Sequence, residues 1–196
     1  MINFSICGII HTIYAEKSIP QYETEKAMII LGLDPGYAIV GYGVLEYRNN
    51  NFNVIDFGAI TTEKDLEFCE RLEQIYDGME YLFNKYKPQA MAVEKLFFNT
   101  NTTTAIGVAQ ARGCCLLASK KANVPVYEYT PLQVKQSVTG YGRAEKKQVM
   151  EMTRIMLGLD HIPKPDDAAD ALAIAICHGH SSGSSLSSQL RKLGLK

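Results

Sequence analysis

The sequence predicts an α/β domain built on a mixed sheet of five strands, three antiparallel and then two parallel, with helices on both faces. Three extended, apolar segments come first, and only turn residues separate them, which indicates an antiparallel meander. Helical and strand patterns alternate after that, as in proteins that layer helices on a sheet. A chain of 196 residues with 46% hydrophobic and 21% charged residues has the composition of one globular domain, which excludes a disordered or membrane-spanning chain.

The first three strands are expected at 28–33, 40–47 and 52–62. The first is a continuous apolar run, as in a strand buried on both faces, and it ends at Asp34, Pro35 and Gly36. The turn-rich segment 48–51 joins the second strand to the third.

The remaining elements alternate between helix and strand. Apolar positions recur at three- and four-residue steps from 65 to 86, which predicts an amphipathic helix that ends before Pro88. A fourth strand is expected at 90–93, closed by Glu94, and a fifth at 124–129. Further helices are expected at 102–122, 131–138, 144–157 and 166–178.

The folded domain is expected to span residues 28–180. An N-terminal extension at 1–27 is predicted to lie outside the fold, and a Ser-rich C-terminal tail is predicted at 181–196. The extension has an apolar stretch, but no basic residue precedes that stretch and no small-residue cleavage motif follows it, so a secretory leader is not predicted.

The cysteines indicate a reducing, cytoplasmic location. They are five in number and form no CxxC pattern, which favours free thiols over a disulfide framework. Cys177, His178 and His180 are interpreted as the end of a helix and not as a zinc site, which would need further ligands at suitable spacing.

Four carboxylates stand at the ends of predicted elements. Asp34 closes the first strand, Glu94 closes the fourth, and Asp167 and Asp170 lie in the first turn of the last helix. Ligand sites in open α/β sheets gather at such strand ends. Taken singly, Asp34 is equally well explained as a turn residue. The helix acids, with Asp166, are better explained, taken singly, as partners of a helix N-terminus. Glu94 is harder to dismiss, because a carboxylate at a buried strand end needs a partner or an ion.

Taken together, these acids suggest a metal-dependent hydrolase. Converging carboxylates without clustered His or Cys are hard oxygen ligands, which suit Mg²⁺ or Mn²⁺. Two such ions would activate a water and stabilise both oxygens of an in-line phosphoryl displacement. Phosphodiester hydrolysis is the reaction that this group of residues fits.

The charge distribution allows a nucleic-acid substrate, although the net charge is only -1. Residues 1–93 hold 7 basic and 13 acidic side chains, whereas residues 94–196 hold 13 and 8. Segment 131–154 contributes a basic cluster of Lys135, Arg143, Lys146, Lys147 and Arg154. A phosphate-binding surface and an ordinary solvated helix face explain this cluster about equally well.

Two aromatic residues follow Glu94 closely. Phe97 and Phe98 lead into the polar segment 99–104. Aromatic side chains in a loop beside a catalytic acid stack on unpaired bases or wedge between them, while a hydrophobic anchor for the loop is an equally simple interpretation.

Several motifs, taken in order, are similar to one known family. They are ILGLDPG at 30–36, AVE at 92–94 with Phe97, AQARG at 109–113, QVKQ at 133–136, AEK at 144–146 and DAADALAIAICH at 167–178. Together they resemble the RuvC family of bacterial Holliday junction resolvases, from residue 28 to about 180. Only the N-terminal extension departs from the pattern.

The resemblance implies an RNase H-like fold and a homodimer that nicks two like strands of a four-way DNA junction symmetrically. It implies that Asp34, Glu94, Asp167 and Asp170 are catalytic acids that bind two Mg²⁺ ions per subunit, with Mn²⁺ as a substitute. Phe97 would stack at the opened junction centre.

The resemblance also covers DNA contacts and partners. It implies that Lys135 and Lys146 contact phosphates near the scissile bond, and the neighbouring Arg143 and Lys147 are expected on the same DNA-binding surface. The products would carry 5′-phosphate and 3′-hydroxyl ends, and the partners would be the branch-migration proteins RuvA and RuvB.

Two other function classes fit part of the sequence. The Asp-Pro-Gly turn before a hairpin resembles the first phosphate loop of actin-like ATPases, but those proteins need a second related domain for which this chain is too short. A non-catalytic junction-binding protein on the same fold is the other alternative, and four intact acids weigh against it.

Overall fold

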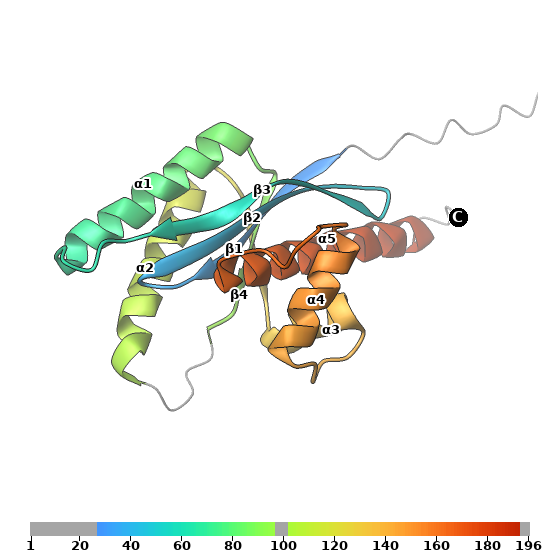
Figure 1. The fold of residues 1–196 in the computed structure, drawn as a ribbon. Helices are drawn as coiled ribbons and strands as arrows, with labels where there is room; N and C mark the ends of the chain where they lie inside the picture. The colour runs from blue at the N-terminus through green and yellow to red at the C-terminus, as the bar shows by residue number, and fades with distance from the viewer. Residues whose placement is uncertain (1–26, 97–101, 193–196) are drawn as a thin grey trace, which may run out of the picture.

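The computed structural model describes residues 27–96 and 102–192 and contains one five-stranded mixed sheet (Figure 1). The strand order is β3-β2-β1-β4-β5. Strand β1 pairs antiparallel with β2 and parallel with β4, which in turn pairs parallel with β5. The predicted sheet is therefore confirmed. Its strands are β1 (Met28–Pro35), β2 (Ile39–Arg48), β3 (Asn51–Thr61), β4 (Ala90–Glu94) and β5 (Val126–Tyr129).

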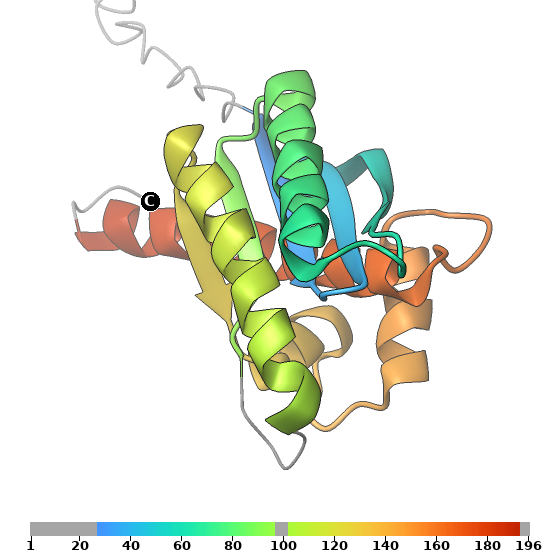
Figure 2. The same cartoon turned by 90° about the vertical axis from the view of Figure 1, so that its left-hand side faces the viewer.

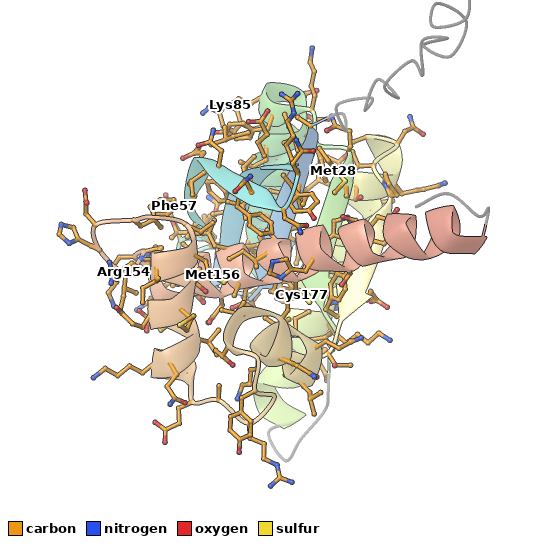
Figure 3. The ribbon with its side chains drawn as sticks, turned by 90° about the vertical axis from the view of Figure 1, so that its right-hand side faces the viewer. Met28, Phe57, Lys85, Arg154, Met156 and Cys177 are labelled. Carbon is orange, nitrogen blue, oxygen red and sulfur yellow. The ribbon has the colours of Figure 1, made fainter. Side chains whose placement is uncertain are left out.

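Helices cover both faces of this sheet, as predicted. On one face lie α1 (Phe68–Tyr86) and α2 (Thr102–Lys121), which stand in front of the strands in Figure 2. On the other face α5 (Asp166–Lys192) crosses the strands, and α3 (Pro131–Thr139) and α4 (Lys146–Met156) pack against it (Figure 3). In the described part of the chain, no helix has both the length and the apolar character needed to cross a membrane.

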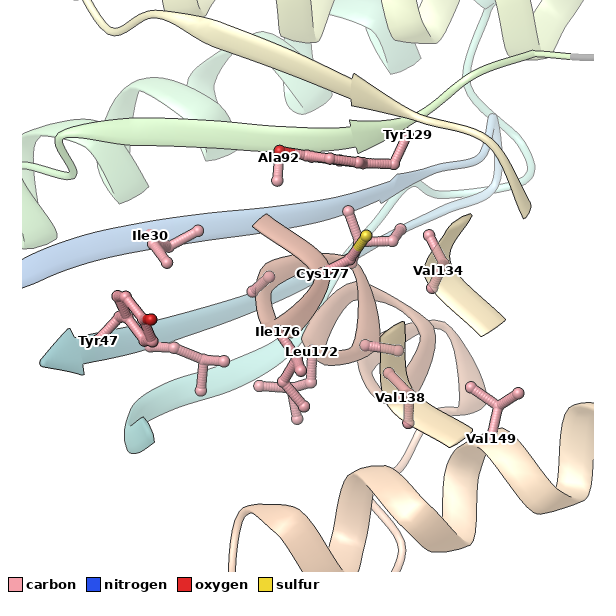
Figure 4. Packing of buried hydrophobic residues seen from close by; sticks show 14 of the residues in the cluster. Ile30, Tyr47, Ala92, Tyr129, Val134, Val138, Val149, Leu172, Ile176 and Cys177 are labelled. Carbon is pink, nitrogen blue, oxygen red and sulfur yellow. The ribbon is translucent and has the colours of Figure 1, made fainter. Parts of the chain in front are cut away.

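Each face of the sheet has its own hydrophobic cluster. The cluster under α1 and α2 includes Leu33, Ile75 and Val93, all fully buried. The cluster under α5 joins Ile30 and Ala92 of the sheet to Leu172, Ile176 and Cys177, as Figure 4 shows. Burial on both faces explains why the first strand reads as an unbroken apolar run.

Strands β1 and β2 lie in backbone contact with α5. Glycines stand where the two strands meet the helix, and a Cβ at Gly41 would overlap the carbonyl oxygen of Asp167. A Cβ at Gly32 would likewise overlap the carbonyl oxygen of Ala171. Because no side chain separates the helix from the strands, the first turn of α5 lies close to the end of β1.

Three predicted helix boundaries are wrong by two residues or more. Helix α4 begins at Lys146 and not at 144, because Glu145 is its N-cap. Helix α1 begins at Phe68 and not at 65, because Glu67 is its N-cap and forms a capping box with Glu70. Helix α5 does not end at His178 but continues to Lys192, through the segment expected as a Ser-rich tail. There the hydroxyl of Ser181 donates to the carbonyl of Cys177 in the preceding turn, which lets serine stay inside a helix.

Several predictions fall on residues that the structure does not describe. The expected N-terminal extension at 1–27 lies outside the described residues except for residue 27, and so does Phe97. Residues 193–196 of the expected tail are also outside.

Candidate metal centre

The sheet places Asp34 and Glu94 side by side. Asp34 lies near the end of β1 and Glu94 is the last residue of β4. The two strands are parallel neighbours, with Leu33 paired to Val93, so the following acids leave the sheet at the same edge. The contact of Gly41 with the first turn of α5 brings Asp167 to this edge.

The charges on these acids interact strongly. The pKa of Asp34 is raised to about 7, first by burial and then by repulsion from Asp170, Glu94 and Asp167. The pKa of Glu94 is raised as well, first by burial and then by Asp170. The four carboxylates predicted from the sequence are therefore brought together by the fold.

Three of the acids share a cavity with two of the predicted lysines. The cavity has a volume of about 270 Å³ and is lined by Asp34, Glu94, Asp170, Lys135 and Lys146. Its apolar wall comes from α3, α4 and α5, where the lining residues are Pro131, Val134, Val149, Ala173 and Ile174. The apolar wall excludes water from one side of the acids, in keeping with the burial that raises the pKa values of Asp34 and Glu94.

Asp167 lines a second cavity. This cavity is about 630 Å³ and lies between the turn that joins β1 to β2, the start of α1 and the first half of α2. Tyr37, Phe68 and Ile106 line it together with Asp167.

The predicted basic residues fall into two groups. Lys146 Nζ lies 2.7 Å from Asp170 Oδ2, and this carboxylate raises the pKa of Lys146. The charge of Lys135 lowers the pKa of Glu94, against the larger effect of burial. Lys147 instead lines a separate cavity with Tyr141 and Glu151, between the end of α3 and α4. Arg143 is exposed in the loop before α4.

Asp166 does not belong to this group of acids. Its side chain is 47% exposed and pairs with Lys164 at 2.6 Å, which lowers the pKa of Asp166. The sequence alone did not separate Asp166 from its neighbour Asp167, because both follow Pro165 at the start of the same helix.

The four carboxylates are suitable ligands for a hard divalent cation, although the described side chains are not arranged around one common point. No group of three or more His, Cys, Asp or Glu side chains in residues 27–96 and 102–192 is placed to hold an ion as it stands. Asp170 is paired with Lys146. The fit comes from the chemistry: four mutually repelling carboxylates at a partly buried site gain stability from a nearby cation.

The sequence analysis missed the residues that bring the acids together. Gly32, Gly41 and Gly43 alternate along β1 and β2 and face α5. Their signal was visible as glycine at alternate positions of a strand, which marks a close backbone approach, together with the Ala-rich start of the last helix.

Known proteins share the sequence pattern and the fold of this chain. The sequence profile described as "Crossover junction endodeoxyribonuclease RuvC" matches residues 30–178. The RuvC protein of Alkaliphilus metalliredigens is 58% identical over 154 residues, which cover 79% of this chain and 94% of that protein. Thermus thermophilus RuvC superposes with a TM-score of 0.76 at 35% identity, over 81% of this chain and 97% of that one.

A second Thermus thermophilus structure, RuvC in complex with a Holliday junction substrate, gives a TM-score of 0.75 at 36% identity and covers 79% of this chain and 94% of its own. The profile covers all four converging acids, and the fold matches the RNase H-like fold of the solved structures. The chain therefore belongs to the RuvC family of crossover junction endodeoxyribonucleases.

Proposed function

We propose that this protein resolves Holliday junctions in DNA recombination and repair by paired symmetric nicks. The reaction is metal-dependent hydrolysis of one phosphodiester in each of two like strands, and it leaves 5′-phosphate and 3′-hydroxyl ends. The observation that supports it best is the convergence of Asp34, Glu94, Asp167 and Asp170 beside Lys135 and Lys146. Family membership and the junction-bound relative from Thermus thermophilus support the choice of substrate.

The acids serve as metal ligands in this proposal. Asp34 and Glu94 project from neighbouring parallel strands, and Asp167 and Asp170 from the first turns of α5. When bound, two Mg²⁺ ions, or Mn²⁺ in their place, supply an activated water and offset charge on the attacking and leaving oxygens. Burial of Asp34 limits the access of competing water to its carboxylate.

The two lysines of the acid-lined cavity bind the DNA backbone at the scissile phosphate. Lys146 holds its ammonium beside Asp170, and Lys135 lines the same cavity from α3. An ammonium in this position binds a phosphate oxygen and offsets the charge that grows in the transition state. Arg143 lies in the loop before α4, and Lys147 lies in α4 next to Lys146. These two residues contact phosphates farther from the scissile bond. Phe97, which follows β4, stacks on bases at the junction centre.

The protein works as a homodimer whose interface includes the outer face of α2. Ile106 and Leu117 are 69% and 56% exposed on this helix, and a Cβ at Gly113 would meet nothing within 4 Å. Large exposed apolar residues beside a glycine are suited to close approach of a second helix. Ala111, in contrast, is fully buried against the sheet, so the small residues of α2 serve packing within the chain as well.

A two-fold dimer places two active sites symmetrically on a nearly two-fold junction, so that both nicks follow from one binding event. The nuclease domain of each subunit spans residues 28–180. The RuvA and RuvB branch-migration complex is the expected partner, and the cytoplasm is the expected location.

The direct test is incubation of the purified protein with a labelled four-way junction and Mg²⁺, with a linear duplex of the same sequence as control. Paired nicks at symmetric positions of the junction, ends that ligase seals, and an intact duplex are the expected results. A junction that is bound but never cut would favour a non-catalytic junction-binding protein. Variation of the sequence at a mobile crossover then measures the preferred cleavage site.

A further inference from the structure

Helix α1 carries a buried arginine that has no acidic partner in the described part of the chain. Arg71 is 7% exposed, and none of the ion pairs formed by the described residues includes it. A buried charge is costly unless other groups compensate it. The contacts of Arg71 therefore show which groups stabilise its buried charge.

The guanidinium group of Arg71 lies on an aromatic ring of the turn that joins β1 to β2. Its central carbon is 3.8 Å from the ring centroid of Tyr37, which is close enough for a cation–π interaction. The Tyr37 ring also stacks on Phe68, with centroids 5.1 Å apart. The ring is thus held from α1 by two side chains.

A second connection reaches the same turn through Thr62. The Nε of Arg71 donates to Thr62 Oγ1 at 2.8 Å, and this hydroxyl donates to the carbonyl oxygen of Tyr37 at 3.1 Å. The backbone N–H of Thr62 donates to the carbonyl oxygen of Ala38, also at 3.1 Å. Arg71, Tyr37 and Thr62 thus form a cluster. Within it, Arg71 contacts the Tyr37 ring, and Thr62 binds the backbone carbonyl groups of Tyr37 and Ala38.

This turn connects two points on which the acid site depends. Asp34 lies two residues before Gly36 on β1. On the other side of the turn, Gly41 of β2 pairs with Asp34 and touches the backbone of Asp167. A shift of the turn would change the position of Asp34 relative to Asp167.

Arg71 is not among the charged groups that shift the pKa of Asp34. The charged groups that set the pKa of Asp34 are the three other acids and Lys146. The influence of Arg71 on the site must therefore pass through the geometry of the turn.

We propose that Arg71 is a positioning residue for junction cleavage. Together with Tyr37 and Thr62 it holds the turn at 36–38, so that Asp34 and Asp167 keep the spacing that the reaction requires. This inference rests on the proposed nuclease function. Misplacement of a reacting group by about 1 Å can cost roughly 10²-fold in rate, so loss of the cluster has a large effect on cleavage without any direct contact to DNA.

Two pairs of variants test this role. Tyr37→Leu removes the aromatic ring, whereas Tyr37→Phe keeps it. Arg71→Met removes the positive charge, whereas Arg71→Lys keeps it. Lys121→Met is the matched control, because it removes a cation that lies 5.1 Å above the Tyr76 ring, away from the acids. Each protein is measured for single-turnover cleavage with Mg²⁺, junction affinity in Ca²⁺, thermal midpoint, and hydrogen exchange of the peptide that contains residues 34–41.

We expect Tyr37→Leu and Arg71→Met to lower the cleavage rate roughly 10- to 100-fold while junction affinity stays within about twofold of the wild type. Hydrogen exchange in the turn should rise in the same two variants. Tyr37→Phe should cleave at the wild-type rate, Arg71→Lys should keep part of that rate, and Lys121→Met should cleave as fast as the wild type.

The alternatives give different results. If the wild type cleaves and Tyr37→Leu and Arg71→Met cleave equally fast, this inference is wrong while the proposed function stands. Equal losses in Tyr37→Phe and Tyr37→Leu, or a loss of rate that matches the loss of junction affinity, would also overturn it. A wild-type protein that cuts no junction would overturn the proposed function, and this inference with it.

Discussion

Lys146 Nζ lies 2.7 Å from Asp170 Oδ2, at the point where the start of α4 meets the start of α5. Lys146 is the first residue of its helix and is 58% exposed, so its ammonium can reach both the acids and an approaching phosphate. Its neighbour Lys147 lines a different cavity. Two adjacent lysines of one helix therefore face different surroundings.

The first prediction compares these two lysines. Lys146→Met should lower the single-turnover cleavage rate by about 10²-fold, because an ammonium that offsets transition-state charge at the scissile phosphate is lost. Lys147→Met should change the rate by less than about threefold and should act mainly on the salt dependence of junction binding. Equal effects of the two substitutions on cleavage would contradict the assignment of Lys146 to the acid site.

The second prediction concerns the metal ligands. Asp34→Asn should lower cleavage at least 10²-fold, since even changes behind a ligand cost about 10- to 100-fold, whereas junction binding should persist because the basic surface is intact. The substitution should not reduce stability, because it removes a charge that is disfavoured first by burial and then by repulsion from the neighbouring acids, the two effects that raise the pKa of Asp34 to about 7.

Asp166→Asn is the matched control for this prediction. Asp166 lies next to Asp167 in sequence but pairs with Lys164 at the surface. Cleavage by Asp166→Asn should be close to that of the wild type. If Asp34→Asn loses junction binding as completely as it loses cleavage, Asp34 has a structural role and is not a metal ligand.

The sequence was sufficient to find Asp34 and Glu94, because both follow short, fully apolar strands and parallel neighbours must end at the same edge. Asp167 and Asp170 were grouped with them by residue type and by their place at the start of a helix, and the family resemblance then assigned all four acids to one metal site. The contact that brings α5 to β1 is made by Gly41 and backbone atoms, and such a contact leaves little trace in hydrophobic periodicity.

The full length of α5 and the burial of Arg71 could not be predicted from the sequence, because both depend on tertiary contacts. The continuation of α5 through its serines depends on hydroxyl groups that bond to the helix itself and on glycines that pack against Tyr47 and Phe52 of the β2–β3 hairpin. The spacing of apolar positions from 65 to 86 does not single out Arg71. Only the tertiary structure shows that its guanidinium is buried on Tyr37.

The third prediction tests the proposed dimer face. Leu117→Glu should convert the protein from dimer to monomer in size-exclusion chromatography with light scattering, because a buried unpaired charge at a helix–helix contact is strongly unfavourable. Ile155→Glu on α4 is the matched control, since Ile155 is 53% exposed, close to the 56% of Leu117, but lies outside α2. A Leu117→Glu protein that remains a dimer would place the interface elsewhere.

The fourth prediction concerns pH and uses His178, which is buried between α5 and the sheet. His178 is 3% exposed, its Nδ1 lies 2.7 Å from the hydroxyl oxygen of Tyr129, and the Tyr127 ring lies 4.3 Å from its own. Burial lowers the pKa of His178 from 6.5 to about 4. The unfolded chain therefore takes up a proton near pH 6.5, whereas the folded protein takes it up only near pH 4.

Because the unfolded state binds this proton first, the stability contributed by neutral His178 is complete above pH 6.5 and decreases as the pH falls toward 4. The free energy of unfolding should lose about 2 kcal/mol from this residue between pH 7 and 5. Urea unfolding of the wild type and His178→Asn at both pH values measures it: the variant should be less stable than the wild type at pH 7, and the gap should narrow at pH 5. His161→Asn, at an exposed histidine, should follow the wild type at both. A gap between wild type and His178→Asn that does not change with pH would show that His178 is not held neutral in the folded protein.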